Sequence, residues 1–286
     1  MTGNTKALRV RIKSVTSTLQ LTKAMGLVAS SKIRRANDAM TKAREYTEAL
    51  ESSIASLTCA TECQKSPYMR KSDGKRTRLI VIAGDRGLAG GYNSNVVKLI
   101  TNGDWSKEDL DIYALGSKGY DALSRRGYNI KENRSDIMDD PTYEDAMKLC
   151  KVVLDSFANG EIGEIYLAYT HFKNTVTHIP TLVKLLPVDT EGMDEVEVDD
   201  NVMMNFEPNT EEALDLVIPK YVTSLFYGAL VESVASENGA RMQAMDSATS
   251  NADEIISDLT LKFNRARQGA ITQELTEIIA GANAIN

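Results

Sequence analysis

Residues 8–57 of this chain read LRVRIKSVTSTLQLTKAMGLVASSKIRRANDAMTKAREYTEALESSIASL. Taken in alternating steps of four and three residues from Leu8 to Leu57, every position is apolar except Thr22, Gly26 and Thr47. A helix that packs on a globular core repeats every 3.6 residues, so a stripe with a period of 3.5 requires a partner helix wound around it. The stripe therefore predicts a coiled-coil helix within residues 1–60, about 75–85 Å long at about 1.5 Å per residue.

The other end of the chain, residues 211–286, repeats this pattern with one or two slips of register. We expect it to pair antiparallel with the first helix, because two comparable helices in one chain make a parallel homodimer the less economical alternative. Pro219 lies early in the segment, where its missing amide and its ring predict a kink or a break. The recurring apolar or small residues are Leu214, Ile218, Tyr221, Leu225, Gly228, Ala235, Gly239, Met242, Met245, Ala252, Ile256, Leu259, Phe263, Ala266 and Ala270.

Between these helical ends, residues 76–188 alternate short apolar runs of strand length with helical patterns. Such alternation indicates βαβ units around a mostly parallel sheet. The sequence thus predicts an α/β fold with long helices, in which a Rossmann-like βαβ domain is inserted between the arms of an antiparallel coiled coil. The expected strands are 79–83, 111–115, 163–169 and an edge strand at 181–186, and the expected helices are 92–100, 117–126 and 143–157.

The composition of the 286 residues, 42% of them apolar, is ordinary for a soluble protein. The sequence shows neither a run of about 18 uncharged apolar residues nor a secretory signal, so we expect a soluble protein that stays in its compartment. Cys59, Cys63 and Cys150 lack CxxC spacing, which favours a reducing cytosol over a disulfide framework. Cys59 and Cys63 could share a helix face, but we expect two plain thiols there rather than a metal site.

Charge is divided unequally along the chain. Residues 1–78 carry 16 Lys and Arg against 6 Asp and Glu, so the remainder is strongly acidic although the net charge is only −7. The first 37 residues hold eight basic side chains and no acidic one. A helix of this kind attracts phosphates, anionic lipid or an acidic protein surface, and a merely solvated basic face is the alternative.

Signals for catalysis are weak. The loop Gly84-Asp85-Arg86-Gly87-Leu88-Ala89-Gly90-Gly91 follows an expected strand, but it is neither GxGxxG nor a P-loop, so a tight structural turn is preferred over a phosphate site. His171 and His178 have no paired nucleophile and no metal-ligand spacing, so a surface or hydrogen-bonded structural role is preferred over a general base. The acidic stretch 189–200 lacks the pattern of a calcium loop. The sequence therefore predicts no catalytic residue, no metal and no cofactor.

Motifs at both ends of the chain resemble those of the γ subunit of F-type ATP synthases. The most specific are SENGARMQAMDSATSNA at 236–252 and NRARQGAITQELTEIIAGA at 264–282. RIKSV at 11–15 and LTKAMGLVASSK at 21–32 are similar to the family's N-terminal helix, and DRGLAGGYN at 85–93 is similar to its first strand-to-helix loop. The resemblance spans the chain in the right order and spacing.

This resemblance implies the central rotor shaft of a bacterial-type enzyme, without catalysis of its own. The coiled coil is expected inside a ring of three α and three β subunits, with the α/β domain at the c-ring and the ε subunit alongside. Transmembrane proton flow would turn the shaft and cycle the catalytic β subunits through their conformations for ATP synthesis or hydrolysis. The coupling ion itself, H⁺ or Na⁺, is chosen in the membrane ring. The chain is expected to bind no nucleic acid and to reach the cytoplasmic face of the cell membrane only peripherally, through the complex.

Seven partner contacts follow from the same resemblance. Arg267 and Gln268 match a pair that hydrogen-bonds a β-subunit loop, while Thr272 and Glu274 match its neighbours in coupling. The remaining three, Lys23, Met25 and Arg241, match positions where the helices cross near acidic β loops.

Two further expectations concern where the matched positions lie. Met25 should lie beside Arg241. A foot on the c-ring aligns, less closely, with Asn205, Phe206 and Glu207.

Some positions depart from the family pattern. Ala89 stands where cysteine is frequent, Phe206 replaces a tyrosine, and the cysteine insert of chloroplast γ subunits is absent, so no thiol switch is expected. Gly239 and Gly269 stand where alanine or serine is commoner, at a cost of about 0.5–1 kcal/mol each in helix stability.

An alternative from another class is a nucleotide-binding α/β module whose basic arms, residues 6–35, grip nucleic acid. It predicts salt-sensitive binding of DNA or RNA by the purified chain.

Overall fold

The computed structural model describes residues 3–59, 66–70, 72, 74–135, 137–188 and 210–285. The expected c-ring foot, 205–207, and the thiol of Cys63 lie outside these ranges. Contacts divide the chain into two compact units. One, the terminal unit, comprises residues 1–29 and 242–286, and the other, the central unit, comprises residues 30–241. Each is described by itself.

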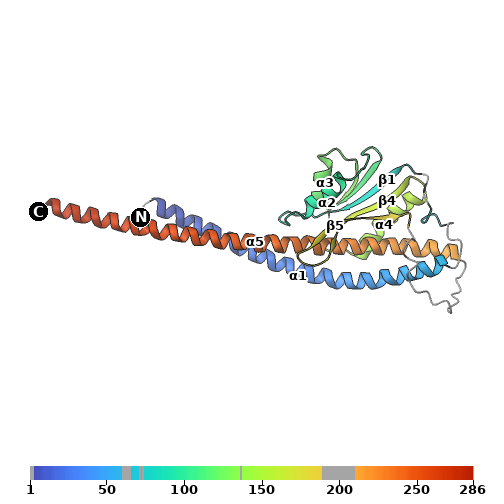
Figure 1. Cartoon of the computed structure of the whole chain (residues 1–286), viewed down its shortest axis with the longest axis horizontal. Helices are drawn as coiled ribbons and strands as arrows, with labels where there is room; N and C mark the ends of the chain where they lie inside the picture. The colour runs from blue at the N-terminus through green and yellow to red at the C-terminus, as the bar shows by residue number, and fades with distance from the viewer. Residues whose placement is uncertain are drawn as a thin grey trace. The chain divides into compact units, whose positions relative to one another are not determined.

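The terminal unit is a pair of helical segments, the first part of α1 (Gly3–Cys59) and the last part of α5 (Thr210–Ile285). The segments run antiparallel (Figure 1). The hydroxyls of Thr22 and Thr249 share a hydrogen bond of 2.8 Å across the seam. A Cβ at Gly26 would lie 3.8 Å from the Cβ of Met245, at ordinary van der Waals distance. Two of the non-apolar positions in the stripe thus lie in the helix contact.

The same two helices pair again inside the central unit. Ile33, Ala36, Ala43, Ile54 and Leu57 continue the stripe of α1, and all are buried. The third non-apolar position, Thr47, shares a 2.7 Å hydrogen bond with Ser224 of α5. The predicted antiparallel coiled coil is confirmed, because all of the stripe's positions from Leu8 to Leu57 are buried or half-buried.

The central unit also contains a five-stranded sheet of order β3-β2-β1-β4-β5. Strands β1 (Arg76–Ile82), β2 (Leu110–Leu115), β3 (Ile130–Arg134) and β4 (Ile162–Phe172) are parallel, and β5 (His178–Leu186) pairs antiparallel with β4 at the edge. All of the expected strands are present. Strand β3 was not predicted, because IKENR is an edge strand whose side chains are only half-buried or exposed.

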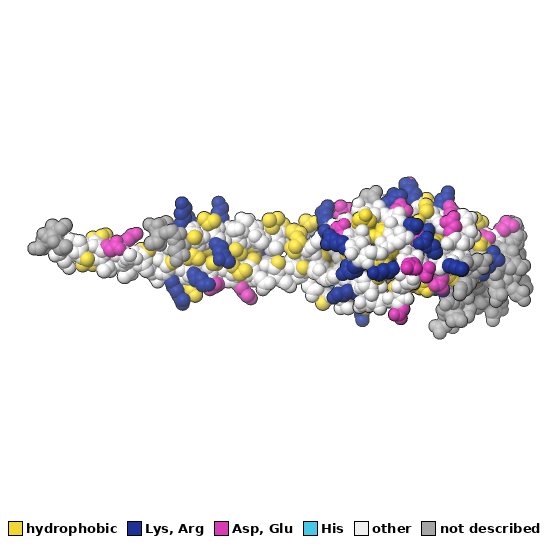
Figure 2. Space-filling model, turned by 90° about the horizontal axis from the view of Figure 1, so that it is seen from above, with side chains coloured by type: hydrophobic (Ala, Val, Ile, Leu, Met, Phe, Trp, Pro, Cys, Tyr) yellow, Lys and Arg dark blue, Asp and Glu magenta, His cyan; other side chains and the backbone are white. Residues whose placement is uncertain are grey.

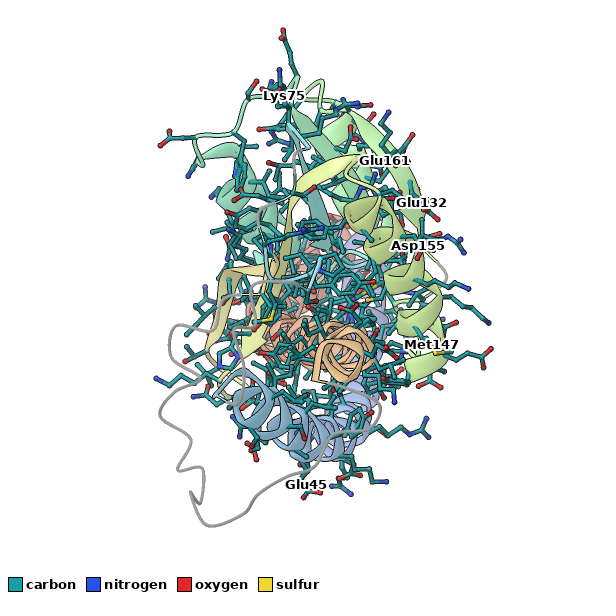
Figure 3. All side chains as sticks on the ribbon, turned by 90° about the vertical axis from the view of Figure 1, so that its right-hand side faces the viewer. Glu45, Lys75, Glu132, Met147, Asp155 and Glu161 are labelled. Carbon is teal, nitrogen blue, oxygen red and sulfur yellow. The ribbon has the colours of Figure 1, made fainter. Side chains whose placement is uncertain are left out.

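Helices cover both faces of this sheet. Leu79 and Val81 of β1 point into a core beneath α2 (Tyr92–Thr101) and α3 (Ser117–Ser124), whereas Ile80 and Ile82 point into the larger core shared with α4 (Tyr143–Ala158) and α5. Figure 3 shows α5 between α1 and the sheet, with α4, which carries Met147 and Asp155, along one side. The predicted Rossmann-like arrangement is confirmed.

Within the central unit, α5 is a core helix. Most side chains from Tyr221 to Asn238 are buried on every side, which explains why the segment is apolar all round. A window within Glu212–Asn283 is long and apolar enough for a membrane span, with a mean hydropathy of 1.3, but 56% of it is buried in the protein. Burial of these side chains inside the protein accounts for that composition.

Pro219 does not interrupt α5. The helix begins at Thr210 and continues through the proline, so the expected break is wrong. The flanking residues Leu214 and Ile218 are 1% and 0% exposed, and Thr223 donates its hydroxyl to the carbonyl of Pro219 at 2.7 Å. Burial of these neighbours holds the backbone helical although the amide is missing.

Candidate functional site: the exposed end of α5 and the Arg241 junction

The last turns of α5 are a largely uncovered surface. Every side chain described from residue 271 to 283 is exposed, and four of them are large and apolar: Ile271, Leu275, Ile278 and Ile279. Monomeric soluble proteins rarely expose such a concentration of apolar side chains without a partner. This end of the helix is therefore a candidate protein interface.

Four predicted contact residues lie on that surface or directly before it. Arg267, Gln268, Thr272 and Glu274 are all exposed. The hydroxyl of Thr272 donates to the backbone carbonyl of Gln268 at 3.0 Å, so it is tied to its own helix. The structure places these residues on one stretch of α5, and their contacts with a partner stay predictions.

The start of α1 presents a basic surface in the same unit. Lys6, Arg9, Arg11, Lys13 and Lys23 are exposed. Large apolar side chains are exposed among them, including Val10 at 63% and Leu21 at 63%, and Figure 2 shows both kinds interspersed. Met25 is half-buried. Basic and apolar groups together fit an acidic protein surface better than a merely solvated face.

Arg241, in the central unit, is held inside the chain. Its Nη2 donates to Oε1 of Glu237 at 2.5 Å and its Nη1 donates to Oδ1 of Asn238 at 3.1 Å. The side chains of Arg241 and Glu237 are only 12% and 8% exposed. Met25 belongs to the other unit, so its expected position beside Arg241 stays a prediction.

Glu237 lies against the end of strand β1. A Cβ built on Gly84 would stand 2.6 Å from Oε1 of Glu237 and 2.7 Å from its Cδ. Only a glycine permits the carboxylate to approach the backbone this closely. Burial raises the pKa of Glu237, opposed by the charge and hydrogen bond of Arg241, while Asp85 raises it further and Lys32 lowers it.

The glycine-rich loop after β1 is filled by its own chain. Asp85 accepts hydrogen bonds from the amide of Ser117 at 2.7 Å and from its hydroxyl at 2.8 Å, at the N-terminus of α3. The amide of Gly84 donates to Oδ1 of Asn93 at 2.7 Å. The loop is thus held by its own hydrogen bonds, one of them through a carboxylate that caps α3, which supports the structural-turn interpretation.

A second polar link lies nearby. Asp139 accepts from Lys32 of α1 at 3.0 Å and from Arg86 at 3.3 Å, and the hydrogen bond from Lys32 lowers the pKa of Asp139 most. A cavity of about 140 Å³ adjoins this link, with Val231 and Val234 of α5 on its apolar side. The surface carboxylate joins α1 to the loop after β1.

Neither histidine has the surroundings of a general base. His171 pairs through Nδ1 with Glu232 of α5 at 2.7 Å. His178 packs on Gly239, where an added Cβ would lie 2.5 Å from its Nε2, and burial lowers the pKa of His178. Among the described residues, Nε2 of His178 has no hydrogen-bond partner, and no group of His, Cys, Asp or Glu could hold a metal ion.

Sequence reasoning placed Glu237 and Asn238 in a family motif and Gly84 in a loop, but it gave none of the three a role of its own. One signal was available, because Glu237 is the only charged residue between Ser233 and Ala240, on a helix turn otherwise made of small residues. A single charged residue in such a stretch indicates that its side chain is paired with a buried partner. The partner's identity, and the role of Gly84, required the three-dimensional structure.

Comparison with known proteins gives one consistent family. A family model described as ATP synthase matches residues 4–285. The ATP synthase gamma chain of Lachnoclostridium phytofermentans is 53% identical over 285 residues, covering 98% of each chain. The gamma chain of Acetobacterium woodii, described as sodium ion specific, is 40% identical over 302 positions and covers 100% of each.

Solved structures agree with this result. A chain of Tetrahymena thermophila mitochondrial ATP synthase, from a structure of its central stalk and c-ring, aligns with a TM-score of 0.62 and 26% identity over 80% of this chain and 99% of that one. A chain of the Euglena gracilis mitochondrial enzyme aligns with a TM-score of 0.67 over 99% and 95% at 17% identity, which supports the fold alone.

Proposed function

The chain belongs to the ATP synthase gamma-chain family, and we propose that it works as the rotating shaft of a bacterial F-type ATP synthase. It is a non-catalytic subunit of that enzyme. The observation that carries the proposal is the uncovered apolar end of α5, with Ile271, Leu275, Ile278 and Ile279 exposed on a helix that is a packed core element elsewhere. A helix end with this much exposed apolar surface needs partner subunits packed around it.

In the proposed assembly, three α and three β subunits surround that end of the helix. The c-ring and the ε subunit lie at the α/β domain. The gamma chains of two bacteria support this assignment by their names, and the Tetrahymena structure supports it as part of a central stalk and c-ring. The chain would then lie on the cytoplasmic face of the bacterial cell membrane, attached only through the complex.

The mechanism we propose rests on asymmetry and stiffness. Two helices packed along a continuous stripe resist bending, and their surface differs from one side to the other. Each orientation would therefore present different contacts to each catalytic β subunit and bias its conformational equilibrium. Ion flow through the membrane ring would supply the rotation. H⁺ is the commoner coupling ion, while the Acetobacterium relative is described as sodium ion specific.

We assign the partner contacts to the residues named from the family resemblance. Arg267 and Gln268, with Thr272 and Glu274, would contact a β-subunit loop, and their exposure on α5 supports this. Exposed Lys23 supports a role near acidic β segments. Met25 and Arg241 complete the set at the helix crossing, where they would lie beside acidic β segments while Glu237 holds the guanidinium of Arg241. Asn205, Phe206 and Glu207 would form the c-ring foot.

The proposed division of labour follows the chain. Residues 1–60 and 211–286 form the shaft, and residues 76–188 form the domain at its base. The nucleic-acid clamp is not supported, because every comparison points to ATP synthase.

The test is reconstitution of the full chain with α and β subunits of a related bacterial enzyme. A complex with one copy of this chain for three α and three β subunits, hydrolysing MgATP, is expected. A chain that stays alone, or that is recovered with nucleic acid in a salt-sensitive manner, would refute the rotor assignment.

A further inference from the structure

Glu237 is an unusual residue for the position it occupies. It is 6% exposed on the buried face of α5, and its neighbours Ser233, Ser236 and Asn238 are also buried. Charged side chains are almost never buried unless they are paired. Its carboxylate is therefore expected to pair with a specific positively charged group.

That partner is Arg241, one turn further along α5. Oε1 of Glu237 accepts from Nη2 of Arg241, and Oδ1 of Asn238 accepts from Nη1, so two acceptors grip the guanidinium from one side of the helix. Exposed i,i+4 pairs contribute little, but this pair is only 8% and 12% exposed. A guanidinium cannot lose its proton in a protein, so only a nearby anion such as the carboxylate of Glu237 can compensate its charge.

The backbone of Gly84 forms a seat for the carboxylate. Any side chain at this position would place its Cβ 2.6 Å from Oε1 of Glu237, inside the closest approach of real atoms. Gly84 is itself fixed, because its amide donates to Asn93. The end of strand β1 therefore holds Glu237, and Glu237 holds Arg241.

We propose that Glu237, seated on Gly84, is a positioning residue that keeps Arg241 folded and neutralised, so that the turning shaft presents no free guanidinium to acidic segments of the catalytic subunits. This inference rests on the proposed function, in which Arg241 lies near those segments. A free arginine at such a place would bind an acidic group best at one angle of rotation. The resulting energy well would slow each turn.

The decisive variant is Glu237→Gln in the reconstituted complex. Glutamine keeps the shape and one acceptor but leaves the guanidinium charge uncompensated, which favours its leaving the low-dielectric site. We expect MgATP hydrolysis to slow about threefold at low ionic strength. The rate should recover at high salt, because the screening length falls from about 30 Å at 0.01 M to about 3 Å at 1 M.

Removal of the arginine separates positioning from structure. In an Arg241→Met background, Glu237→Gln should add no salt-dependent loss, because no guanidinium remains to be released. Glu232→Gln is the matched control, since Glu232 is another glutamate of α5 that pairs with His171 and not with an arginine. It should show no recovery with salt.

A second variant moves the carboxylate without removing its charge. Gly84→Ala should displace Glu237 from its seat and reproduce the salt-dependent slowing to a smaller degree. Gly228→Ala is its control, because a Cβ there meets nothing within 4 Å. If Glu237→Gln fails to fold, the Gly84→Ala variant tests the positioning role of Glu237 instead.

The outcomes separate the two proposals. If the unmodified chain does not assemble with α and β subunits, the rotor function fails. If it assembles and hydrolyses normally, but the slowing is absent, independent of salt or still present without Arg241, only the role of Glu237 is overturned. Salt-reversible slowing that requires Arg241 is the result we expect.

Discussion

Two stretches of the single helix α5 differ sharply in what surrounds them. Between Tyr221 and Asn238 most side chains are buried against α1, the sheet and α4. From residue 271 to 283 every side chain described is exposed, with large apolar residues among them. The first stretch is stabilised by its own chain. The second has helical periodicity and apolar surface, but none of the described residues buries it, so its stability as a helix depends on partners.

The largest expected effect comes from making the same substitution, leucine to alanine, once in each of the two stretches. Leu230 is 0% exposed and Leu275 is 54% exposed. Leu230→Ala should lower the free energy of unfolding by about 2–5 kcal/mol, because it leaves a cavity in the core, whereas Leu275→Ala should change it by less than about 0.5 kcal/mol. Urea unfolding of the purified full chain measures both. Equal losses would show that the second stretch is packed in the free chain.

The exposed stretch should matter in the complex instead. Arg267→Ala combined with Gln268→Ala should reduce ATP-driven ion pumping about tenfold, which corresponds to about 1.4 kcal/mol, because both side chains are proposed to grip a β-subunit loop. Assembly should be largely intact, since most of the shaft surface is unchanged. The pumping rate per ATP hydrolysed, in vesicles, measures the coupling. Unchanged pumping would count against the assigned contact.

A smaller effect distinguishes two glycines of α5 that a sequence cannot tell apart. Gly239→Ala should destabilise the chain by about 1 kcal/mol net, because the new Cβ would meet Nε2 of His178 at 2.5 Å and this overpacking outweighs the gain in helix propensity. Gly228→Ala should stabilise it by about 0.5–1 kcal/mol, because nothing lies within 4 Å of its Cβ.

Thermal unfolding of both variants tests this pair. His178→Ala should convert Gly239→Ala into a stabilising change, since it removes the ring that the new Cβ meets. Destabilisation that persists without the ring would point to the helix backbone instead.

Long-range periodicity made the helices and most strands predictable. A seven-residue stripe is visible in the sequence because its members are regularly spaced, and the stripe correctly located Thr22 and Thr47, whose hydroxyls pair with Thr249 and Ser224. Strand β3 escaped because an edge strand needs no apolar run. Local chemistry also misled at Pro219, where burial of the flanking residues overrides the lost hydrogen bond.

The surroundings of Arg241 were predictable only in part. Resemblance singled out Arg241 as a contact, and the structure shows it gripped by Glu237 and Asn238. The sequence gives no reason for a glycine at residue 239 or at residue 84. The reason is the close approach of His178 to Gly239 and of Glu237 to Gly84. Such roles depend on residues that are 61 and 153 positions away in the sequence, and no local pattern encodes that approach.

The smallest effect concerns the exposed link of the central unit, which contrasts with the buried pair at Arg241. The side chain of Asp139 is 64% exposed, and its hydrogen bond with Lys32 lowers its pKa. Because that pKa lies below the unfolded value of about 3.9, the link stabilises the fold at neutral pH and loses this contribution as pH falls below about 4. Because the pair is exposed, it contributes only about 0.2–1 kcal/mol to the free energy of unfolding. The advantage of the unmodified chain over Asp139→Asn in urea unfolding should therefore be full at pH 7 and should shrink toward zero in acid; a constant difference across that range would mean that the asparagine perturbs packing rather than charge.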